Sequence, residues 1–185
     1  MIKFFGLLSK KKKVKPATAV SIYVALLKNV ISGGFVEIKD FINNNNNLAN
    51  NPNIDDTDID WFSNVVFLGN MKNLEMYFEE DEVSILRALI LDEVHKDIEE
   101  NEQNLAVERF LDYENYFKDL LVKYEIPINA MAHAIFEKYN INDFQGDLFK
   151  KKNKPNPVFL NELKNLLNHF IWNWSEYLQK NKLNF

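Results

Sequence analysis

The chain has 185 residues, 46% of them hydrophobic and none of them cysteine, so it can bury a core but cannot form disulfides or thiolate metal sites. Its net charge of −5 disfavours nucleic acid as a partner, because phosphate groups are repelled by an acidic surface. Only 5 glycines and 5 prolines are available for tight turns, which predicts an all-α fold, either a helical bundle or an orthogonal helical array of six to seven helices.

Residues 1–15 are predicted to be a basic and apolar N-terminal arm, followed by a single helical domain over residues 16–185. The arm holds six of the 22 lysines and arginines and no acid, so the rest of the chain has 16 basic against 27 acidic residues, a net charge of −11. The arm could contact an anionic membrane surface weakly through Phe4, Phe5, Leu7, Leu8 and Lys10 to Lys13. It lacks the pattern of an export signal, and no later stretch supplies the roughly 18 uninterrupted apolar residues of a membrane span.

The first helix is predicted to begin at Pro16, whose fixed φ suits a first turn, and to end at Gly33-Gly34, which can form a left-handed stop. Its buried face follows three- and four-residue spacing and consists of Ala19, Val20, Tyr23, Leu26, Leu27, Val30 and Ile31. A shorter helix is expected around Ile38 to Ile42. The Asn-rich residues 43–53 have the composition of a disordered loop.

The next segment has two interpretations. A helix capped by Thr57 or Asp58 would bury a face of Ile59, Phe62, Val65 and Val66 and would break or bend at Gly69-Asn70. Alternatively, residues 62–78 contain the two short strands of a hairpin. The spacing of the apolar residues favours the helix.

The stretch from Asp81 to Glu100 is predicted to be a central helix, because it is apolar almost all round in its first half and acidic at its end. Arg87 falls within the apolar arc of this helix. Since a guanidinium stays charged at any ordinary pH, Arg87 either extends its head into water or forms an ion pair that fixes how the helices pack.

Three more helices complete the predicted fold. Residues 106–124 show apolar positions alternating by four and three, and a short helix follows over residues 128–140. After a basic loop at residues 150–154, the last helix opens with Asn156 as N-cap and Pro157 in the first turn and continues through Leu178.

Histidine and carboxylate side chains suggest one candidate metal site. Asp92, His95 and Glu99 lie within about 60° of one another on a helical projection, and both residue types ligate zinc and iron. His133 and His169, on separate predicted helices, could complete the site. However, carboxylate-bridged metal bundles use two Glu-x-x-His motifs, and this chain has one approximate copy, so the expectation is that no cofactor binds.

A tryptophan outside the apolar stripe of the last helix suggests a partner-binding surface. Trp172 projects about 160° from Trp174 on a continuous helix, and Asn165 and Glu176 lie on the same polar face. Such a tryptophan either packs under a second layer of chain or anchors a partner protein. Asn165, Trp172 and Glu176 are therefore the predicted partner-binding residues.

The sequence contains no Gly-rich phosphate loop, nucleophile elbow or zinc-protease motif. We therefore expect a non-enzymatic, cytoplasmic protein-binding module whose acidic surface attracts a basic partner, for instance an immunity or antitoxin protein that neutralises a cationic nuclease. The alternatives are a metal-dependent enzyme built on the histidines and acids above, and a peripheral membrane protein recruited by residues 1–15.

Overall fold

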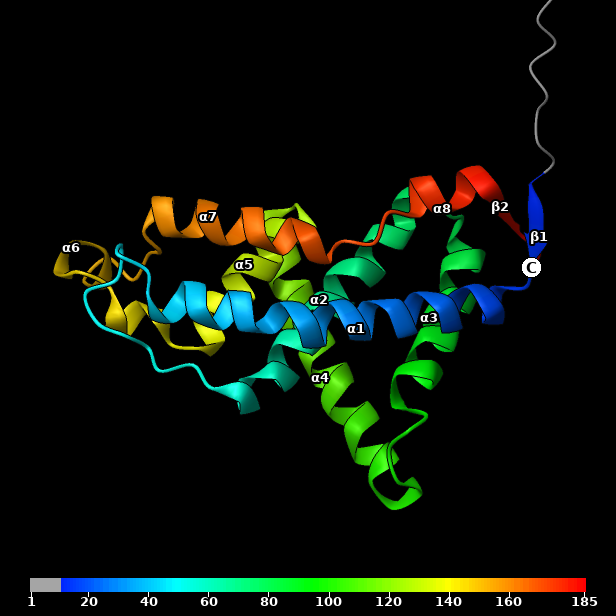
Figure 1. The fold of residues 1–185 in the computed structure, drawn as a ribbon, viewed down its shortest axis with the longest axis horizontal. Helices are drawn as coiled ribbons and strands as arrows, with labels where there is room; N and C mark the ends of the chain where they lie inside the picture. Colours follow the sequence, from blue (N-terminus) through cyan, green and yellow to red (C-terminus); the bar gives the residue numbers. More distant parts are fainter. Residues whose placement is uncertain (1–10) are drawn as a thin grey trace, which may run out of the picture.

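The computed structural model describes residues 11–185, so the membrane contacts predicted for Phe4, Phe5, Leu7, Leu8 and Lys10 lie outside the described residues. The prediction of an all-α helical array is confirmed (Figure 1). The α-helices are α1 Pro16–Asn43, α2 Ile59–Asn73, α3 Glu80–His95, α4 Glu100–Tyr124, α5 Pro127–Lys138, α6 Asp147–Lys150, α7 Pro157–Leu167 and α8 Trp174–Lys180. Short 3-10 turns lie at η1 Asp56–Asp58, η2 Leu74–Met76, η3 Ile141–Phe144 and η4 Asn168–Phe170.

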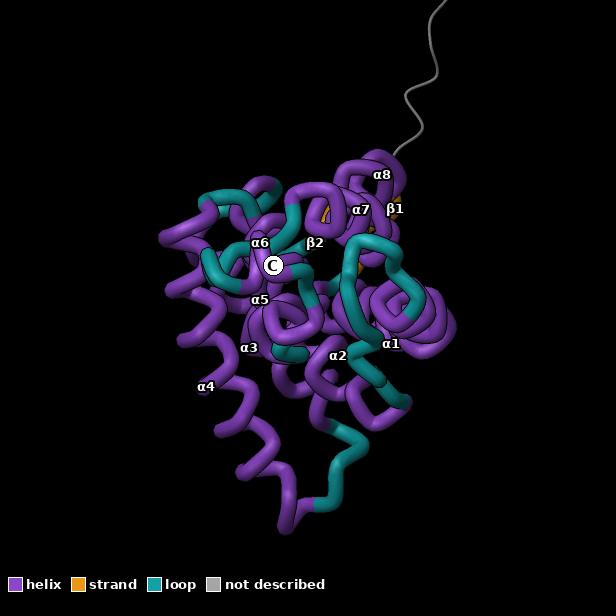
Figure 2. Tube along the Cα trace, turned by 90° about the vertical axis from the view of Figure 1, so that its left-hand side faces the viewer, coloured by secondary structure: helices purple, strands orange, loops and turns teal. Residues whose placement is uncertain are grey.

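The helices cross one another instead of forming a parallel bundle. Figure 1 shows α1 and α7 along the long axis of the molecule, with α3 and α4 running across it. In Figure 2 α1 is seen end-on and α4 lies on the opposite side of the molecule, with α2 and α5 between them. Helix α1 packs against α3, α2 and α7, while α5 packs against α2, α4 and α7. One cluster of buried apolar side chains extends from Val14 to Leu183.

The helix end predicted at Gly33-Gly34 is wrong, because α1 continues to Asn43 and includes the short helix expected near Ile38. A Cβ atom at position 34 would lie only 2.7 Å from Cζ of Phe170. Glycine at position 34 therefore serves close helix packing, and it does not terminate the helix. Leu26 and Val30, predicted to face the core, are 45% and 43% exposed.

Helix α1 is long and apolar enough to cross a membrane by length and composition alone, with a mean hydropathy of 1.6 in its most apolar window. It passes this test although the sequence holds no run of roughly 18 uninterrupted apolar residues. In the structure 39% of that window is buried, on the side that packs against α3, α2 and α7.

The hairpin alternative for residues 62–78 is also wrong, because α2 runs unbroken from Ile59 to Asn73. A Cβ atom at Gly69 would lie 2.2 Å from Sδ of Met131 on α5. The absence of a side chain at Gly69 therefore lets α2 and α5 approach closely. A helix interior tolerates one glycine at a cost of about 1 kcal/mol, and this close packing can offset it.

The Asn-rich loop at residues 43–53, expected to be disordered, is held by hydrogen bonds. The Asn43 side chain donates to the carbonyl oxygen of Ile54 and accepts from the Ile54 amide, both at 2.8 Å. The Ala49 amide donates to the carbonyl oxygen of Phe144 at 2.7 Å. Asparagine side chains satisfy backbone groups that an irregular loop leaves unpaired.

Two short parallel strands, which the sequence did not predict, join the ends of the described chain. Strand β1 (Lys12–Val14) pairs with β2 (Asn181–Leu183), with Lys12 opposite Asn181. The valine and leucine at the ends of the two strands are buried. Residues 12–14, assigned to the N-terminal arm by their lysine content, therefore pack as part of the helical fold.

Arg87 forms the structural ion pair that was one of its two predicted alternatives. Its guanidinium donates to Oε1 of Glu114 on α4, and Lys118 donates to the other carboxylate oxygen at 3.1 Å. Burial alone would raise the pKa of the Glu114 carboxyl, but the hydrogen bond and charge of Arg87 hold that pKa below its ordinary value. The pair joins α3 to α4.

Candidate functional site

The last predicted helix is interrupted, and this interruption shapes the candidate site. Helix α7 ends at Leu167, the chain makes the turn η4, and α8 begins only at Trp174. The Asn70 side chain, 1% exposed, donates to the carbonyl oxygen of Phe170 at 2.8 Å and accepts from the Trp172 amide at 2.7 Å. These bonds replace the helical hydrogen bonds that the interruption removes. The predicted projection of Trp172 on a continuous helix is therefore wrong.

A cavity of about 320 Å³ opens between α1 and the segment that follows the interruption. Leu26 and Val30 line it from α1, and Trp172 and Tyr177 line it from the other side. We call this cavity and its lining the α1–α8 groove. Ile22, 43% exposed, lies one turn before Leu26, so apolar side chains follow each other along α1 at four-residue spacing.

The exposed side of α1 carries no charged residue over most of its length. From residue 17 to residue 36, the exposed positions of α1 are Ala17, Thr18, Ile22, Ala25, Leu26, Asn29, Val30, Ser32, Gly33 and Val36. The one charged residue in this range, Lys28, is half-buried and donates to the carbonyl oxygen of Val94 at 3.0 Å. In a chain of which 26% is charged, such a face is unusual for a surface in contact with water.

The structure brings two of the three predicted partner-binding residues together. Trp172 is half-buried in the wall of the α1–α8 groove, and Glu176 lies at its rim on α8, paired with Lys180 at 4.0 Å. Asn165 lies elsewhere, beside a separate hollow between α7 and the Asn-rich loop. The interruption of the helix separates Asn165 from the surface that it was predicted to share.

Packed aromatic rings form the wall behind the groove. The Trp172 ring lies 5.6 Å from Tyr23 and 6.1 Å from both Trp174 and Tyr177, measured between centroids. Within residues 11–185 the hydroxyl of Tyr23 and the indole nitrogens of both tryptophans are buried without a hydrogen-bond partner. Burial raises the pKa of Tyr23 above its ordinary value. Because the Trp172 indole N–H is covered, the wall offers a partner mainly apolar contact.

The candidate metal ligands are not assembled as predicted. Helix α3 ends at His95, so Glu99 lies beyond it as the N-cap of α4, and Asp92 is exposed. His95 is 4% exposed and packs edge-on against Phe110 at 5.6 Å. In the part of the chain that the structure describes, no group of three or more histidine and acidic side chains is placed to hold a metal ion.

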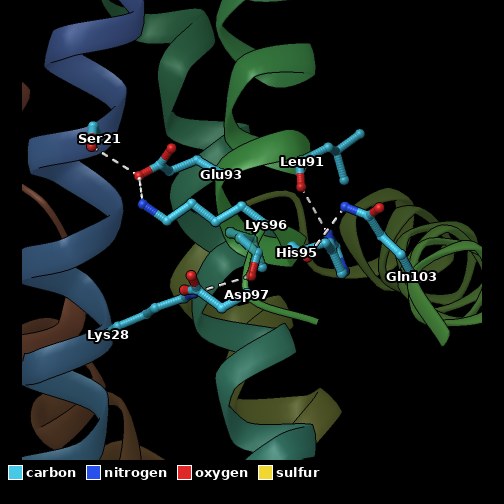
Figure 3. A network of polar contacts seen from close by, with 9 residues as sticks. Ser21, Lys28, Leu91, Glu93, His95, Lys96, Asp97 and Gln103 are labelled. Carbon is cyan, nitrogen blue, oxygen red and sulfur yellow. Dashed lines mark hydrogen bonds and ion pairs between the residues drawn. The ribbon is translucent and has the colours of Figure 1, made fainter. Parts of the chain in front are cut away.

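Glu93, which the sequence did not single out, is the centre of the polar contacts that join α1 to α3 (Figure 3). Its carboxylate accepts from Nζ of Lys96 at 2.7 Å and from Oγ of Ser21 at 2.8 Å. The bonds from Lys96 and Ser21 hold the pKa of Glu93 below its ordinary value. Lys28 lies 3.6 Å from Asp97 in the same region, so this network positions α1 against α3.

The other two histidines lie in different surroundings. The His133 ring stacks on Tyr124 with centroids 3.5 Å apart, and burial lowers its pKa to about 4, with Lys123 and Lys164 adding to the effect. His169 lies in η4 at the edge of the α1–α8 groove and is exposed. The three histidines therefore do not lie together in one site.

Comparison of this chain with protein-family models, with curated proteins and with solved structures gives no match. The sequence signal that could have identified the groove is the spacing of Ile22, Leu26 and Val30, which forms a second apolar stripe beside the buried one.

Proposed function

We propose that this protein is a non-enzymatic binding module that holds an amphipathic segment of a partner protein in the α1–α8 groove. The observation that carries the proposal is the pair of exposed side chains Leu26 and Val30 beside Trp172, on a helix face without exposed charge. An apolar groove between helices accepts the apolar stripe of a partner helix, with anchors at four-residue spacing.

The charge distribution supports a basic partner. Residues 16–185 carry 16 basic against 27 acidic residues, and Glu176 stands at the rim of the groove. The apolar groove would supply most of the affinity, while the acidic body would accelerate encounter with a positively charged protein. An immunity or antitoxin protein that neutralises a cationic nuclease is one concrete form of this proposal.

Affinity capture from native lysate tests the proposal when three baits are compared. The groove variant carries Leu26→Asp and Val30→Asp, and the matched control carries Val122→Asp, because Val122 is an exposed valine on α4 that does not line the groove. A partner retained by the wild type and the control but lost by the groove variant is the expected result. A partner that all three baits retain equally would contradict the assignment of the groove.

A second candidate is contact of α1 with a membrane surface, which the apolar composition of this helix favours. Lys11, Lys12 and Lys13 are exposed just before its first turn, where they would face anionic lipid. Co-sedimentation with phosphatidylcholine vesicles, with and without phosphatidylserine, separates the two candidates. Binding that needs phosphatidylserine and is lost in the groove variant would favour the membrane, whereas no sedimentation with either vesicle would remove it.

A further inference from the structure

A second cavity, of about 410 Å³, lies away from the α1–α8 groove, where α2, α3 and α4 meet. Its apolar lining includes Phe67 and Phe110, both 1% exposed. Its polar lining includes His95, which was predicted as a metal ligand and has no role in the groove. The volume is within the range of sites that bind small organic molecules.

His95 presents a hydrogen-bond acceptor in this cavity. Its Nδ1 lies 2.8 Å from the carbonyl oxygen of Leu91, and since a carbonyl only accepts, this contact places a proton on Nδ1 (Figure 3). In the neutral ring the other nitrogen, Nε2, then holds a lone pair. Within residues 11–185 Nε2 has no hydrogen-bond partner, although the side chain is 4% exposed. A donor group bound in the cavity would therefore pair with Nε2.

Positive charge also gathers at this cavity, against the charge of the whole protein. Arg109 and Lys28 line it, and Asp60 is its one acidic residue, in a body whose net charge is −11. Lys28 is engaged with the carbonyl oxygen of Val94 and lies 3.6 Å from Asp97, whereas Arg109 is exposed and makes no ion pair with any other described residue. A free guanidinium presents paired donors that match a carboxylate in a bidentate contact.

We propose that this cavity binds a small organic carboxylate that has an apolar body and one hydroxyl or amine donor. Arg109 receives the carboxylate, Phe67 and Phe110 contact the apolar body, and Nε2 of His95 accepts from the donor group. Each of these residues contacts a different part of the ligand. The site therefore binds inorganic anions and uncharged apolar molecules more weakly than such a carboxylate.

The probe para-hydroxybenzoate has all three features, and benzoate lacks only the donor. In a proton–nitrogen correlation spectrum of the imidazole rings of the full chain, para-hydroxybenzoate should move the Nε2 resonance of His95. Benzoate should bind more weakly and leave that resonance nearly unchanged. If inorganic phosphate binds as well as para-hydroxybenzoate, or if the Nε2 resonance of His95 stays fixed at saturation, the proposal is overturned.

A pair of variants tests the role of Arg109. Arg109→Gln should weaken para-hydroxybenzoate binding by about tenfold or more, the expected loss for a charged hydrogen-bonded contact. Lys182→Gln, which removes a positive charge from an exposed strand position outside the cavity, should leave the affinity unchanged. Equal affinities for Arg109→Gln and the wild type would contradict the assignment, and spectra of the free variants show whether each is folded.

Discussion

Asn70 holds the backbone at Trp172 from 102 positions earlier in the chain, accepting a hydrogen bond from the Trp172 amide at 2.7 Å. The same side chain donates to the carbonyl oxygens of Phe170 and Val66, so every hydrogen bond of the Asn70 side chain is made with a main-chain group. The groove exists because this buried amide stabilises an interruption between α7 and α8. An amide is suited to the task because it offers donors and an acceptor together.

Replacing Asn70 by leucine should lower the free energy of unfolding by about 3 kcal/mol, because several buried backbone groups lose their partners. Urea denaturation measures the change. Asn101→Ala, at an exposed position in the first turn of α4, is the matched control and should change stability by less than about 0.5 kcal/mol. Equal stability of Asn70→Leu and Asn101→Ala would contradict the role given to Asn70.

The adjacent glycines of α1 should respond in opposite directions to alanine. Gly34→Ala places a methyl group against the Phe170 ring and should destabilise the protein by about 1–3 kcal/mol. At Gly33 no atom lies within 4 Å of the added Cβ, so Gly33→Ala should stabilise it by roughly 0.5–1 kcal/mol through helix propensity. Thermal or urea unfolding of the two variants provides the comparison, and stabilisation by Gly34→Ala as well would contradict the close packing at Phe170.

The ion pair between Arg87 and Glu114 should contribute stability that depends on pH. Because the pKa of Glu114 is lowered in the folded protein, its contribution is present above the ordinary carboxyl pKa of 4.5 and is lost as pH falls through the folded value. Glu114→Gln should therefore cost about 2 kcal/mol at neutral pH and less in acid. Glu108→Gln, at an exposed position of the same helix, is the control. An equal cost of Glu114→Gln at all pH values would contradict the ionic origin.

His133 should make the folded state less stable in mildly acidic solution. Its pKa is about 4 in the folded protein against an ordinary value of 6.5, so the unfolded chain binds a proton first as pH falls between these values. Stability should decline over this interval, by on the order of 2 kcal/mol, and His133→Gln should remove that part of the decline. A His133 resonance that titrates near 6.5 in the folded protein would contradict this prediction.

The sequence predicts α4 well, because one apolar period decides which residues are buried there, as Phe110, Phe117 and Leu120 show. The extent of α5 is also predicted, although residues 130–136 are all buried and follow no such period. The sequence wrongly predicts that helices end or bend at Gly34 and Gly69. A glycine without a side chain permits either a turn or a close contact between helices, and the sequence does not distinguish the two. Only the fold shows that Phe170 lies against Gly34 and Met131 against Gly69.

The candidate site was harder to predict than the helices. Trp172 was found because an aromatic residue stood among polar ones, but the interruption around it depends on Asn70, which is distant in the sequence. The sequence places Leu26 and Val30 in the core because leucine and valine are the residue types that usually fill a core, although both are exposed in the structure. Leu26 and Val30 differ from the buried residues of α1 only in their position around the helix, beside the buried stripe.

The most direct test of the account is isothermal titration calorimetry of a captured partner against the wild type, the Leu26→Asp and Val30→Asp double variant, and Val122→Asp. We expect a loss of affinity of at least about tenfold for the groove variant, since each apolar contact contributes about 1.5 kcal/mol or more. We also expect wild-type affinity for Val122→Asp and weaker association as salt rises. Equal affinity of all three proteins for the partner would contradict the central claim.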